Sequence, residues 1–291
     1  GVDADTHEAI STGHEDVKFG FSIASGAAWD AILSVKKHDS LELRGLHAHI
    51  GSQIFTPDSF ELSASRLISV LAKYRDEFGA ELAELDLGGG YAIAYVEGDK
   101  PSSAQEILSV IATKVKAECE KALLKIPRIS IEPGRVIVGP AMVTIYKVGT
   151  TKEVSLADGT TRWYVSVDGG MSDNIRPALY EAQYSIALAN RSSSAPLRKS
   201  RVVGKHCETG DIIIRDVQLP SDITPGDLLA VPATGAYGRS MASNYNHMTR
   251  PPVICVLNGK ARSIIRRETH RDLLALEIEE EPRQIGKGEQ R

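Results

Sequence analysis

The stretch LAELDLGGGY, residues 82–91, predicts a buried strand that ends in an unusual turn. A short apolar run is followed at once by three glycines, whose bare backbone lets an anion approach their N–H groups closely. The glycines do not form a GxGxxG fingerprint, and no Gly-Lys-Ser or Gly-Lys-Thr follows them as in a Walker A loop. A phosphate cradle and a plain turn both remain open on this stretch alone.

Two similar runs lie on either side of this strand, at a spacing of about 40 residues. Leu43–Ile50 leads into HIGSQ, and Ile129–Ile131 leads into EPGR. Strands that alternate with helices at this period indicate βαβ units and a parallel sheet. Chemistry at the carboxyl ends of successive parallel strands is typical of a (β/α)₈ barrel, although an open doubly wound sheet would also place ligands there.

The segments between these strands show the periodicity of amphipathic helices. In the first, apolar residues recur at steps of three and four and form one face: Phe60, Ala64, Leu67, Leu71, Tyr74 and Phe78. Gly79 follows them and is a suitable C-terminal cap. A second helix begins after Ser103, which stands three residues before Glu106 in a capping-box spacing. Its apolar face is Ile107, Ile111, Val115 and Cys119. We therefore expect Cys119 to pack in the core.

The second half of the chain has a different sequence pattern. Short β-branched runs broken by Gly, Pro and Asp predict an antiparallel β domain. We expect an α/β domain at residues 1–138, a β domain at 139–266, a short helix at 267–277 and a disordered charged tail at 278–291. Only three or four β/α units fit before residue 138, whereas a barrel needs eight. Because the first residue is Gly1 rather than Met, we expect that the chain lacks the N-terminal part of a barrel.

Composition excludes several classes of protein. The chain of 291 residues is 42% apolar and 25% charged, which is ordinary for a globular protein. Lys and Arg (34) against Asp and Glu (38) give a net charge of −4, so we expect no nucleic-acid partner. No apolar run approaches the ~18–20 residues that span a bilayer, so we expect no membrane partner. Three cysteines without close pairing favour a reducing, cytoplasmic setting.

The first half of the chain holds two charged or titratable motifs. In HAHIGSQ, residues 47–53, His47 and His49 share one face of a strand. They could contact a ligand, bind a metal for which no third ligand is evident, or be ordinary interior histidines. In EPGR, Glu132 and Arg135 flank a turn, where they pair with each other or hold a ligand of both charges.

The second half adds three motifs. In DGGMSDNIRPALY, residues 168–180, Arg176 and Tyr180 face the same way if the segment is helical. In HCETGD, residues 206–211, Cys207 has no apolar helical face to pack into, so it is the cysteine that could serve chemistry. In ATGAYG, residues 233–238, Tyr237 stands between glycines, as in loops that approach a ligand and in simple turns.

Taken together, the order of these motifs resembles the fold-type III pyridoxal-phosphate-dependent decarboxylases. HIGSQ, GGGY, EPGR, DGGMSDNIRPALY, CETGD and GAYG follow one another as in that family. The resemblance implies the C-terminal part of a pyridoxal-phosphate-binding (β/α)₈ barrel followed by an antiparallel β domain. It also implies a cytoplasmic homodimer with active sites at the interface. The motifs are most similar to those of members that convert meso-2,6-diaminopimelate to L-lysine and CO₂, the last step of lysine biosynthesis.

The resemblance also implies a role for each matching residue. His49 would stack on the pyridine ring and Glu132 would bind the ring nitrogen. The cofactor phosphate would be held by Ser52, Gly88, Gly89, Gly90, Gly134, Arg135 and Tyr237. The substrate would contact Arg135, Arg176, Tyr180, Glu208 and Tyr237, with Arg176 suited to a distal carboxylate. Cys207 would return a proton to the substrate carbon, and it would reach the partner's active site together with Glu208.

One family feature is missing. The lysine that carries the cofactor lies in a Tyr-x-x-Lys-Ala type motif, which this sequence does not contain; Lys18 stands in a different context. We therefore expect the chain alone to be inactive, and no metal is implied. Two alternatives stay open. One is a decarboxylase of the same fold for ornithine, arginine or carboxynorspermidine, and the other is a non-catalytic regulatory homologue.

Overall fold

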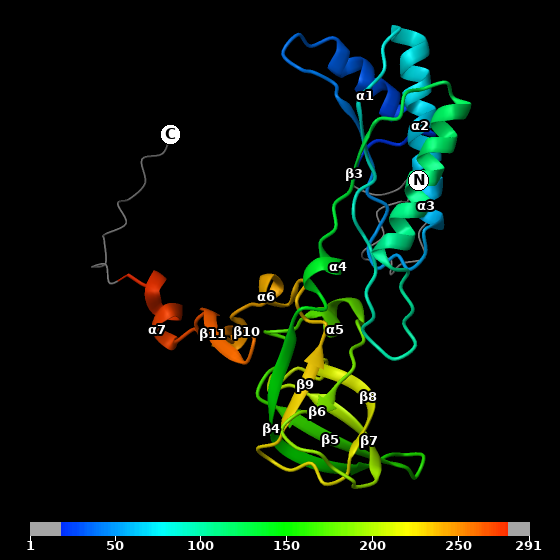
Figure 1. The fold of residues 1–291 in the computed structure, drawn as a ribbon. Helices are drawn as coiled ribbons and strands as arrows, with labels where there is room; N and C mark the ends of the chain where they lie inside the picture. Colours follow the sequence, from blue (N-terminus) through cyan, green and yellow to red (C-terminus); the bar gives the residue numbers. More distant parts are fainter. Residues whose placement is uncertain (1–18, 279–291) are drawn as a thin grey trace.

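The computed structural model describes residues 19–278. In Figure 1 the first helices and strands form one end of the molecule, a β-sheet unit forms the other, and a C-terminal segment projects to one side. The helices are α1 (Ala27–Lys36), α2 (Asp58–Phe78), α3 (Ala104–Lys121), α4 (Arg135–Val138), α5 (Arg176–Tyr180), α6 (Gly238–Met241) and α7 (His270–Leu273), with the 3-10 turns η2 (Tyr245–His247) and η3 (Leu274–Leu276). The strands are β1 (Gly45–His47), β2 (Glu84–Asp86), β3 (Arg128–Ser130), β4 (Val143–Ser155), β5 (Thr161–Val167), β6 (Ala187–Leu188), β7 (Leu197–Val203), β8 (Ile212–Pro220), β9 (Leu228–Pro232), β10 (Val253–Leu257) and β11 (Lys260–Ile265).

The three strands predicted in the first half form a parallel sheet in the order β1-β2-β3. Leu85 of β2 lies opposite Leu46 of β1 and Ile129 of β3. The strands run in one direction because α2 and α3 return the chain between them, as in βαβ units. Their carboxyl ends therefore lie at one edge, and this edge carries the HIGSQ, GGGY and EPGR turns.

Both predicted helices are confirmed with their caps. The α2 helix ends at Gly79, which adopts the left-handed conformation at φ 64°. The α3 helix begins with the complete capping box of Ser103 and Glu106. The predicted apolar faces pack together against the parallel sheet, and Phe60 and Val115 are fully buried between them. Cys119 is also fully buried, as its place on the apolar face predicts.

The second half contains a six-stranded sheet in the order β6-β9-β4-β5-β7-β8. The predicted antiparallel pairing holds for every pair in this sheet except one, because β5 and β7 run parallel. The chain between β5 and β7 contains α5 and β6, and a crossover of that length brings β7 back in the direction of β5. The sheet has its own apolar cluster, which includes Trp163, Val165 and Val231.

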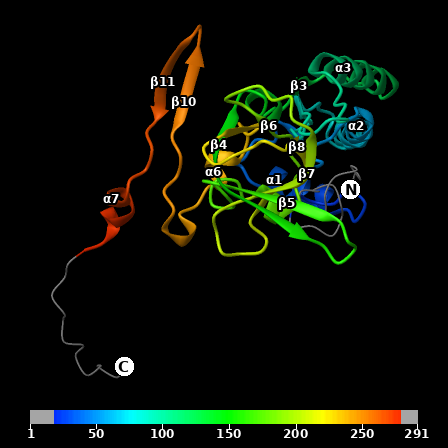
Figure 2. The same cartoon turned by 90° about the horizontal axis from the view of Figure 1, so that it is seen from below.

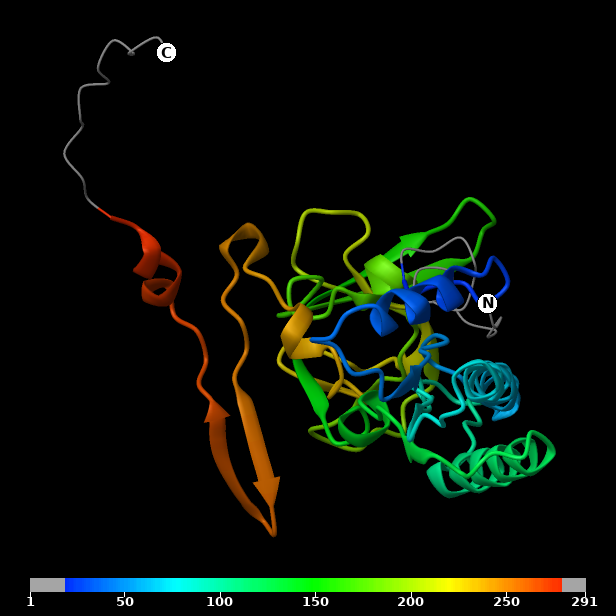
Figure 3. The ribbon, with the colours of Figure 1, turned by 90° about the horizontal axis from the view of Figure 1, so that it is seen from above.

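The C-terminal segment departs from a compact β domain. Strands β10 and β11 pair with each other in an antiparallel hairpin, which stands apart from the six-stranded sheet in Figures 2 and 3. The short helix expected near residue 270 is present as α7 and η3. The tail predicted to be disordered falls, beyond Ile278, outside the described residues. Domain boundaries at residues 138 and 266 remain predictions.

Among residues 19–278, no helix combines the length and the apolar character that a bilayer crossing would require.

Candidate active site

The turns after β1, β2 and β3 are joined by backbone hydrogen bonds. The Glu132 N–H donates to the Gly88 carbonyl at 2.8 Å, and the Ala48 N–H donates to the Asp86 carbonyl at 3.0 Å. The Gly89 N–H also donates to Nδ1 of His49 at 3.3 Å. The predicted cofactor residues of three separate motifs therefore lie side by side at the carboxyl edge of the sheet.

The three glycines are required by this close packing. A Cβ atom on Gly88 would lie 2.5 Å from the Ala48 carbonyl oxygen, and one on Gly89 would lie 2.4 Å from the Glu132 carbonyl oxygen. Gly88 and Gly90 also adopt positive φ angles of 69° and 103°. The packing of the strand ends thus explains why glycines occupy these positions, which the composition of the motif did not reveal. The role of the GGGY motif as a phosphate cradle remains a prediction.

The titratable groups at this edge lie close enough to interact. Nε2 of His47 lies 3.2 Å from Oε2 of Glu132, and both side chains are about half exposed. Burial lowers the pKa of His49, and the nearby Glu132 carboxylate opposes that shift. The His49 imidazole is therefore predominantly neutral at pH 7, which suits contact with an aromatic ring. Glu132 pairs with His47 rather than with Arg135, so the ion pair within EPGR is not formed.

Asp86 completes a cluster that the sequence did not indicate. One ligand atom from each of Asp86, His47 and Glu132 lies within 4.8 Å of the others. His49 is not a member of this cluster, so the cluster does not supply a third ligand to the pair of histidines. The cluster belongs to the same edge of the sheet as His49, and it provides no argument of its own for a metal.

Arg135 is one of two buried arginines beside this edge. It begins α4 and is only 7% exposed. Its Nη1 donates to the Tyr95 hydroxyl at 2.5 Å, and its Nη2 donates to Oγ of Ser52 at 2.8 Å. Its guanidinium also lies over the ring of Tyr237, 4.9 Å from the centroid. Its Nε is buried without a hydrogen-bond partner.

Arg176 is the second buried arginine, at 6% exposure in the first turn of α5. Its Nη1 donates to the Tyr184 hydroxyl at 2.6 Å. Its guanidinium lies 5.1 Å from the ring centroid of Tyr95 and 6.0 Å from that of Tyr237. The two arginines therefore share two tyrosine rings, although Arg135 and Arg176 come from different halves of the sequence.

Neither buried guanidinium forms an ion pair with a carboxylate of residues 19–278; their side-chain partners there are phenols and a serine hydroxyl. A buried charge without an opposite charge is costly. The neutral side chain of Asn174 is also buried and supplies no counter-charge. The arrangement is typical of a site that receives an anion.

Tyr95, Tyr184 and Asn174 are site residues that the sequence analysis missed. Tyr95 follows the glycine loop in a stretch where Tyr91, Ala92, Ile93 and Tyr95 are all buried. The apolar run YAIAY, residues 91–95, was a signal that this segment is buried. Tyr184 offered no comparable signal, because it is brought to Arg176 by the turn that follows α5.

The Cys207 turn, residues 206–211, is joined by hydrogen bonds to the segment that carries Arg176. The buried Asp211 carboxylate accepts the N–H groups of Met171 at 2.7 Å and His206 at 2.8 Å. Nε2 of His206 lies 2.9 Å from Oγ of Ser172. Cys207 itself is exposed, as expected for a cysteine without an apolar helical face. Its delivery into a partner's active site remains a prediction.

The remaining predicted residues are placed as follows. Tyr237 adopts a left-handed φ of 67° and caps α6 beside the two arginines. The turn before it packs tightly, because a Cβ atom on Gly235 would lie 1.7 Å from the Val138 carbonyl oxygen. Gly134 precedes the first residue of α4. Tyr180 ends α5 and is half-buried, and its contact with substrate remains a prediction.

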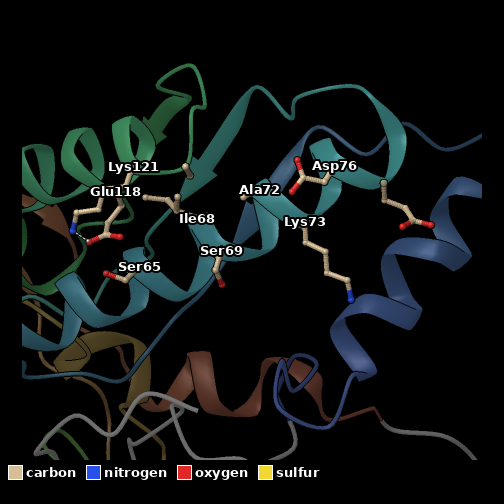
Figure 4. Close-up of a pocket in the computed structure, with 10 residues that line it drawn as sticks. Ser65, Ile68, Ser69, Ala72, Lys73, Asp76, Glu118 and Lys121 are labelled. Carbon is tan, nitrogen blue, oxygen red and sulfur yellow. Dashed lines mark hydrogen bonds and ion pairs between the residues drawn. The ribbon is translucent and has the colours of Figure 1, made fainter.

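A surface groove of about 560 Å³ lies elsewhere, over α2 and α3 (Figure 4). Some of its charged groups have partners: Glu118 forms ion pairs with Lys114 and Lys121. The Lys73 ammonium lies 3.9 Å from the centroid of the Trp29 ring. Glu118 and Lys121 thus have an opposite charge beside them, which the two buried arginines lack among the described residues.

Comparison with known proteins shows which proteins the chain resembles. Residues 1–139 match the family model of the pyridoxal-dependent decarboxylases, pyridoxal binding domain. The chain is 53% identical over 282 residues to diaminopimelate decarboxylase of Mycobacterium tuberculosis, a match that covers 96% of this chain and 63% of the relative. Over these ranges the chain is similar to the pyridoxal-dependent decarboxylases. The Bacillus subtilis diaminopimelate decarboxylase is 46% identical over 278 residues, covering 96% and 62% of the two chains.

Solved structures of decarboxylases of this family agree with the fold. The crystal structure of diaminopimelate decarboxylase from Helicobacter pylori in complex with L-lysine matches with a TM-score of 0.82 and 32% identity, covering 94% of this chain and 64% of that one. The predicted fold class, part of an α/β barrel followed by a β domain, is confirmed. Pyridoxal 5′-phosphate is the cofactor that the matched family model indicates. The chain spans about three fifths of the length of these decarboxylases.

Proposed function

We propose that the whole protein decarboxylates meso-2,6-diaminopimelate to L-lysine and CO₂ with pyridoxal phosphate as cofactor. The observation that carries this proposal is the pair of buried arginines, Arg135 and Arg176, which share Tyr95 and Tyr237 and lack a carboxylate partner within residues 19–278. A substrate with a carboxylate at each end supplies one anion to each guanidinium. The similarity to curated diaminopimelate decarboxylases supports the same substrate.

The residues at the sheet edge suit the cofactor. Pyridoxal phosphate supplies an electron sink for the pair that remains when CO₂ leaves. The neutral His49 imidazole would lie against the pyridine ring, and the Glu132 carboxylate would hold the proton of the ring nitrogen. The unpartnered Nε of Arg135 provides a donor to an anion beside Ser52. Gly134, Tyr237 and the N–H groups of Gly88, Gly89 and Gly90 would complete the phosphate site.

Substrate selection depends on Arg176 in this account. Its guanidinium is already oriented by the Tyr184 hydroxyl, and a planar guanidinium binds a carboxylate with two parallel hydrogen bonds. Diaminopimelate has a distal carboxylate, whereas ornithine ends in a bare ammonium. Arg176 therefore favours diaminopimelate over the basic amino acids, and Tyr180 on the same helix would contact the distal end.

The proton that replaces CO₂ must come from a group at the site. We assign it to the Cys207 thiol, with Glu208 binding the distal ammonium of the substrate. Because Cys207 is exposed in this chain, we propose that a homodimer delivers both residues into the partner's active site. A cytoplasmic location suits three free cysteines in a biosynthetic enzyme.

Two other functions make different predictions. A decarboxylase for ornithine, arginine or carboxynorspermidine would prefer those substrates in a direct comparison. A regulatory homologue would bind no cofactor covalently, and the DNA upstream of codon 1 shows whether a cofactor-binding lysine is encoded there.

The test is a rate comparison on the whole protein loaded with pyridoxal phosphate. We expect CO₂ release and lysine formation from meso-diaminopimelate, with kcat/KM for ornithine and arginine at least ~100-fold lower, as expected when a buried guanidinium loses its anion. A preference for ornithine or arginine would contradict the proposed substrate, and no turnover with any of them would favour the regulatory alternative.

A further inference from the structure

The Cys207 turn meets a second segment, residues 242–250, through one shared oxygen. The Tyr245 hydroxyl donates a hydrogen bond to Oε1 of Glu208. The Cys207 thiol donates to the same oxygen, with Sγ 3.5 Å away. The ring of His206 lies next to that of Tyr245, with centroids 5.5 Å apart. One carboxylate oxygen therefore joins a phenol to the thiol that we assign as proton donor.

The backbone on the Cys207 side of this contact is firmly held. Asp211 is only 4% exposed and binds the N–H groups of Met171 and His206. A Cβ atom on Gly204 would lie 2.1 Å from the Asp211 carboxylate, so the chain passes close to that carboxylate. The position of the Cys207 backbone is thus fixed without any help from Tyr245.

The backbone on the Tyr245 side is also held. Nη1 of Arg250 donates to Oδ1 of Asn244 at 2.7 Å and to Oε1 of Glu268 at 2.8 Å. The Ser243 N–H donates to the Ser172 carbonyl at 2.8 Å, which ties this segment to the one that carries Arg176. Tyr245 therefore projects from a stable turn, and its hydroxyl meets Glu208 at a defined place.

We propose that Tyr245 is a positioning residue that fixes the Glu208 carboxylate against the Cys207 thiol. The catalytic meaning of this inference rests on the proposed function, whereas the contact itself does not. The Tyr245 hydrogen bond lowers the pKa of Glu208, partial burial opposes the shift, and Cys207 and His206 support it. Glu208 is therefore anionic at neutral pH, and a phenol that donates to a carboxylate forms a strong, oriented hydrogen bond.

Alkylation of Cys207 tests the inference without any decarboxylase activity. Iodoacetamide is neutral and iodoacetate is anionic, so the ratio of their rates at Cys207 reports a negative charge held beside the thiol. We expect the ratio of iodoacetamide to iodoacetate rates to fall about threefold in Tyr245→Phe, the size of an exposed charge interaction. Peptide mapping separates Cys207 from Cys255, and Cys119 reports unfolding because it is labelled only when the core opens.

A double-mutant cycle shows whether Tyr245 acts through Glu208. The Glu208→Gln substitution alone should lower the ratio, and adding Tyr245→Phe should then change nothing further. The matched control is Tyr164→Phe on β5, which should leave the ratio at its original value. An unchanged ratio in Tyr245→Phe, or an equal fall in both backgrounds, would overturn the proposal.

A measurement on the unsubstituted protein guards against variants that fail to fold. The carboxyl groups of glutamate can be labelled with ¹³C and followed by NMR as the pH is lowered. The Glu208 signal is assigned as the one that is missing from the spectrum of Glu208→Gln. We expect this signal to titrate at a lower pH than that of a free glutamate. Titration at the ordinary value would overturn the proposal. Neither readout uses turnover, so this inference fails or holds separately from the proposed decarboxylation.

Discussion

Tyr95 places its hydroxyl 2.5 Å from Nη1 of Arg135. The same ring lies 5.1 Å from the Arg176 guanidinium and meets the ring of Tyr184 edge-on, with centroids 5.1 Å apart. One tyrosine therefore contacts both buried arginines. If the arginines bind the two ends of a dicarboxylate, Tyr95 and Tyr184 determine how well each end is held.

Removing the Tyr184 hydroxyl should weaken substrate binding selectively. In Tyr184→Phe, Arg176 loses its hydrogen-bond acceptor while the ring contacts remain. We expect KM for meso-diaminopimelate to rise about tenfold, near the lower end of the effect of one hydrogen bond to a charged group. The affinity for pyridoxal phosphate should stay unchanged, since Arg176 is assigned to substrate alone. A parallel loss of cofactor affinity would show that this division of roles is mistaken.

Replacing Arg176 itself should have a larger effect of the same kind. Arg176→Leu removes the buried cation and should lower kcat/KM for meso-diaminopimelate by ~100-fold or more. Steady-state kinetics with absorbance titration of the cofactor measure the two affinities separately. The Arg198→Leu variant on β7, whose guanidinium lies over Trp163, is the matched control. Equal losses of substrate and cofactor binding would argue against a substrate role.

Removing the Cys207 thiol should reduce turnover rather than binding. We expect kcat of Cys207→Ala to fall ~10²-fold or more, as for the loss of an acid–base group, with KM nearly unchanged. Cys255→Ala provides a cysteine control outside the turn, since Cys255 lies on the projecting β10 strand. An unchanged rate in Cys207→Ala would remove this thiol from the mechanism.

The glycine loop makes a prediction about stability. Gly89→Ala places a Cβ atom 2.4 Å from the Glu132 carbonyl oxygen, so the adjacent strand ends must move apart. We expect a loss of about 1–3 kcal/mol in the free energy of unfolding, measured by urea denaturation. Gly210→Ala, where nothing lies within 4 Å of the new atom, should cost much less. Equal stability of the two variants would mean that the strand ends are not packed as described.

The Arg250–Glu268 pair predicts a pH dependence of stability. Burial raises the pKa of Glu268, but hydrogen bonds from Arg250 and Asn244 outweigh it and lower the pKa to about 2. Because the folded pKa lies below the unfolded value, the pair stabilises the protein above about pH 4.5 and loses this effect as the pH falls toward 2. Glu268→Gln should therefore cost about 1–3 kcal/mol at pH 7 and progressively less on acidification. A cost independent of pH between 7 and 3 would show that the charge is not responsible.

Regular elements were predictable because their patterns are local. The apolar spacing of α2 and α3, their caps and the three parallel strands follow from residues near one another in sequence. The parallel pairing of β5 with β7 was not predictable, since it depends on how the long connection between them crosses the sheet. The sequence also did not indicate that the hairpin of β10 and β11 stands apart from that sheet.

Site residues that lie within a recognisable sequence motif were predictable. Site residues that are brought together only by the packing of distant segments were not. His49, Glu132 and the glycines were found from motifs, and the structure joins them at one edge. Tyr95 and Tyr245 were missed because each matters through a partner far away in sequence, Arg135 for one and Glu208 for the other. Burial of a cation without a counter-charge is a property of the fold, and no linear pattern reveals it.

The most direct test of the central claim is a crystal structure of the whole protein with pyridoxal phosphate and pimelate, a seven-carbon dicarboxylate that lacks the amino groups. We expect one carboxylate of pimelate to form two hydrogen bonds with Arg176 and the other to lie toward Arg135, with His49 and Glu132 both touching the cofactor ring. Pimelate bound away from Arg176, or a cofactor ring that touches only one of His49 and Glu132, would contradict the account.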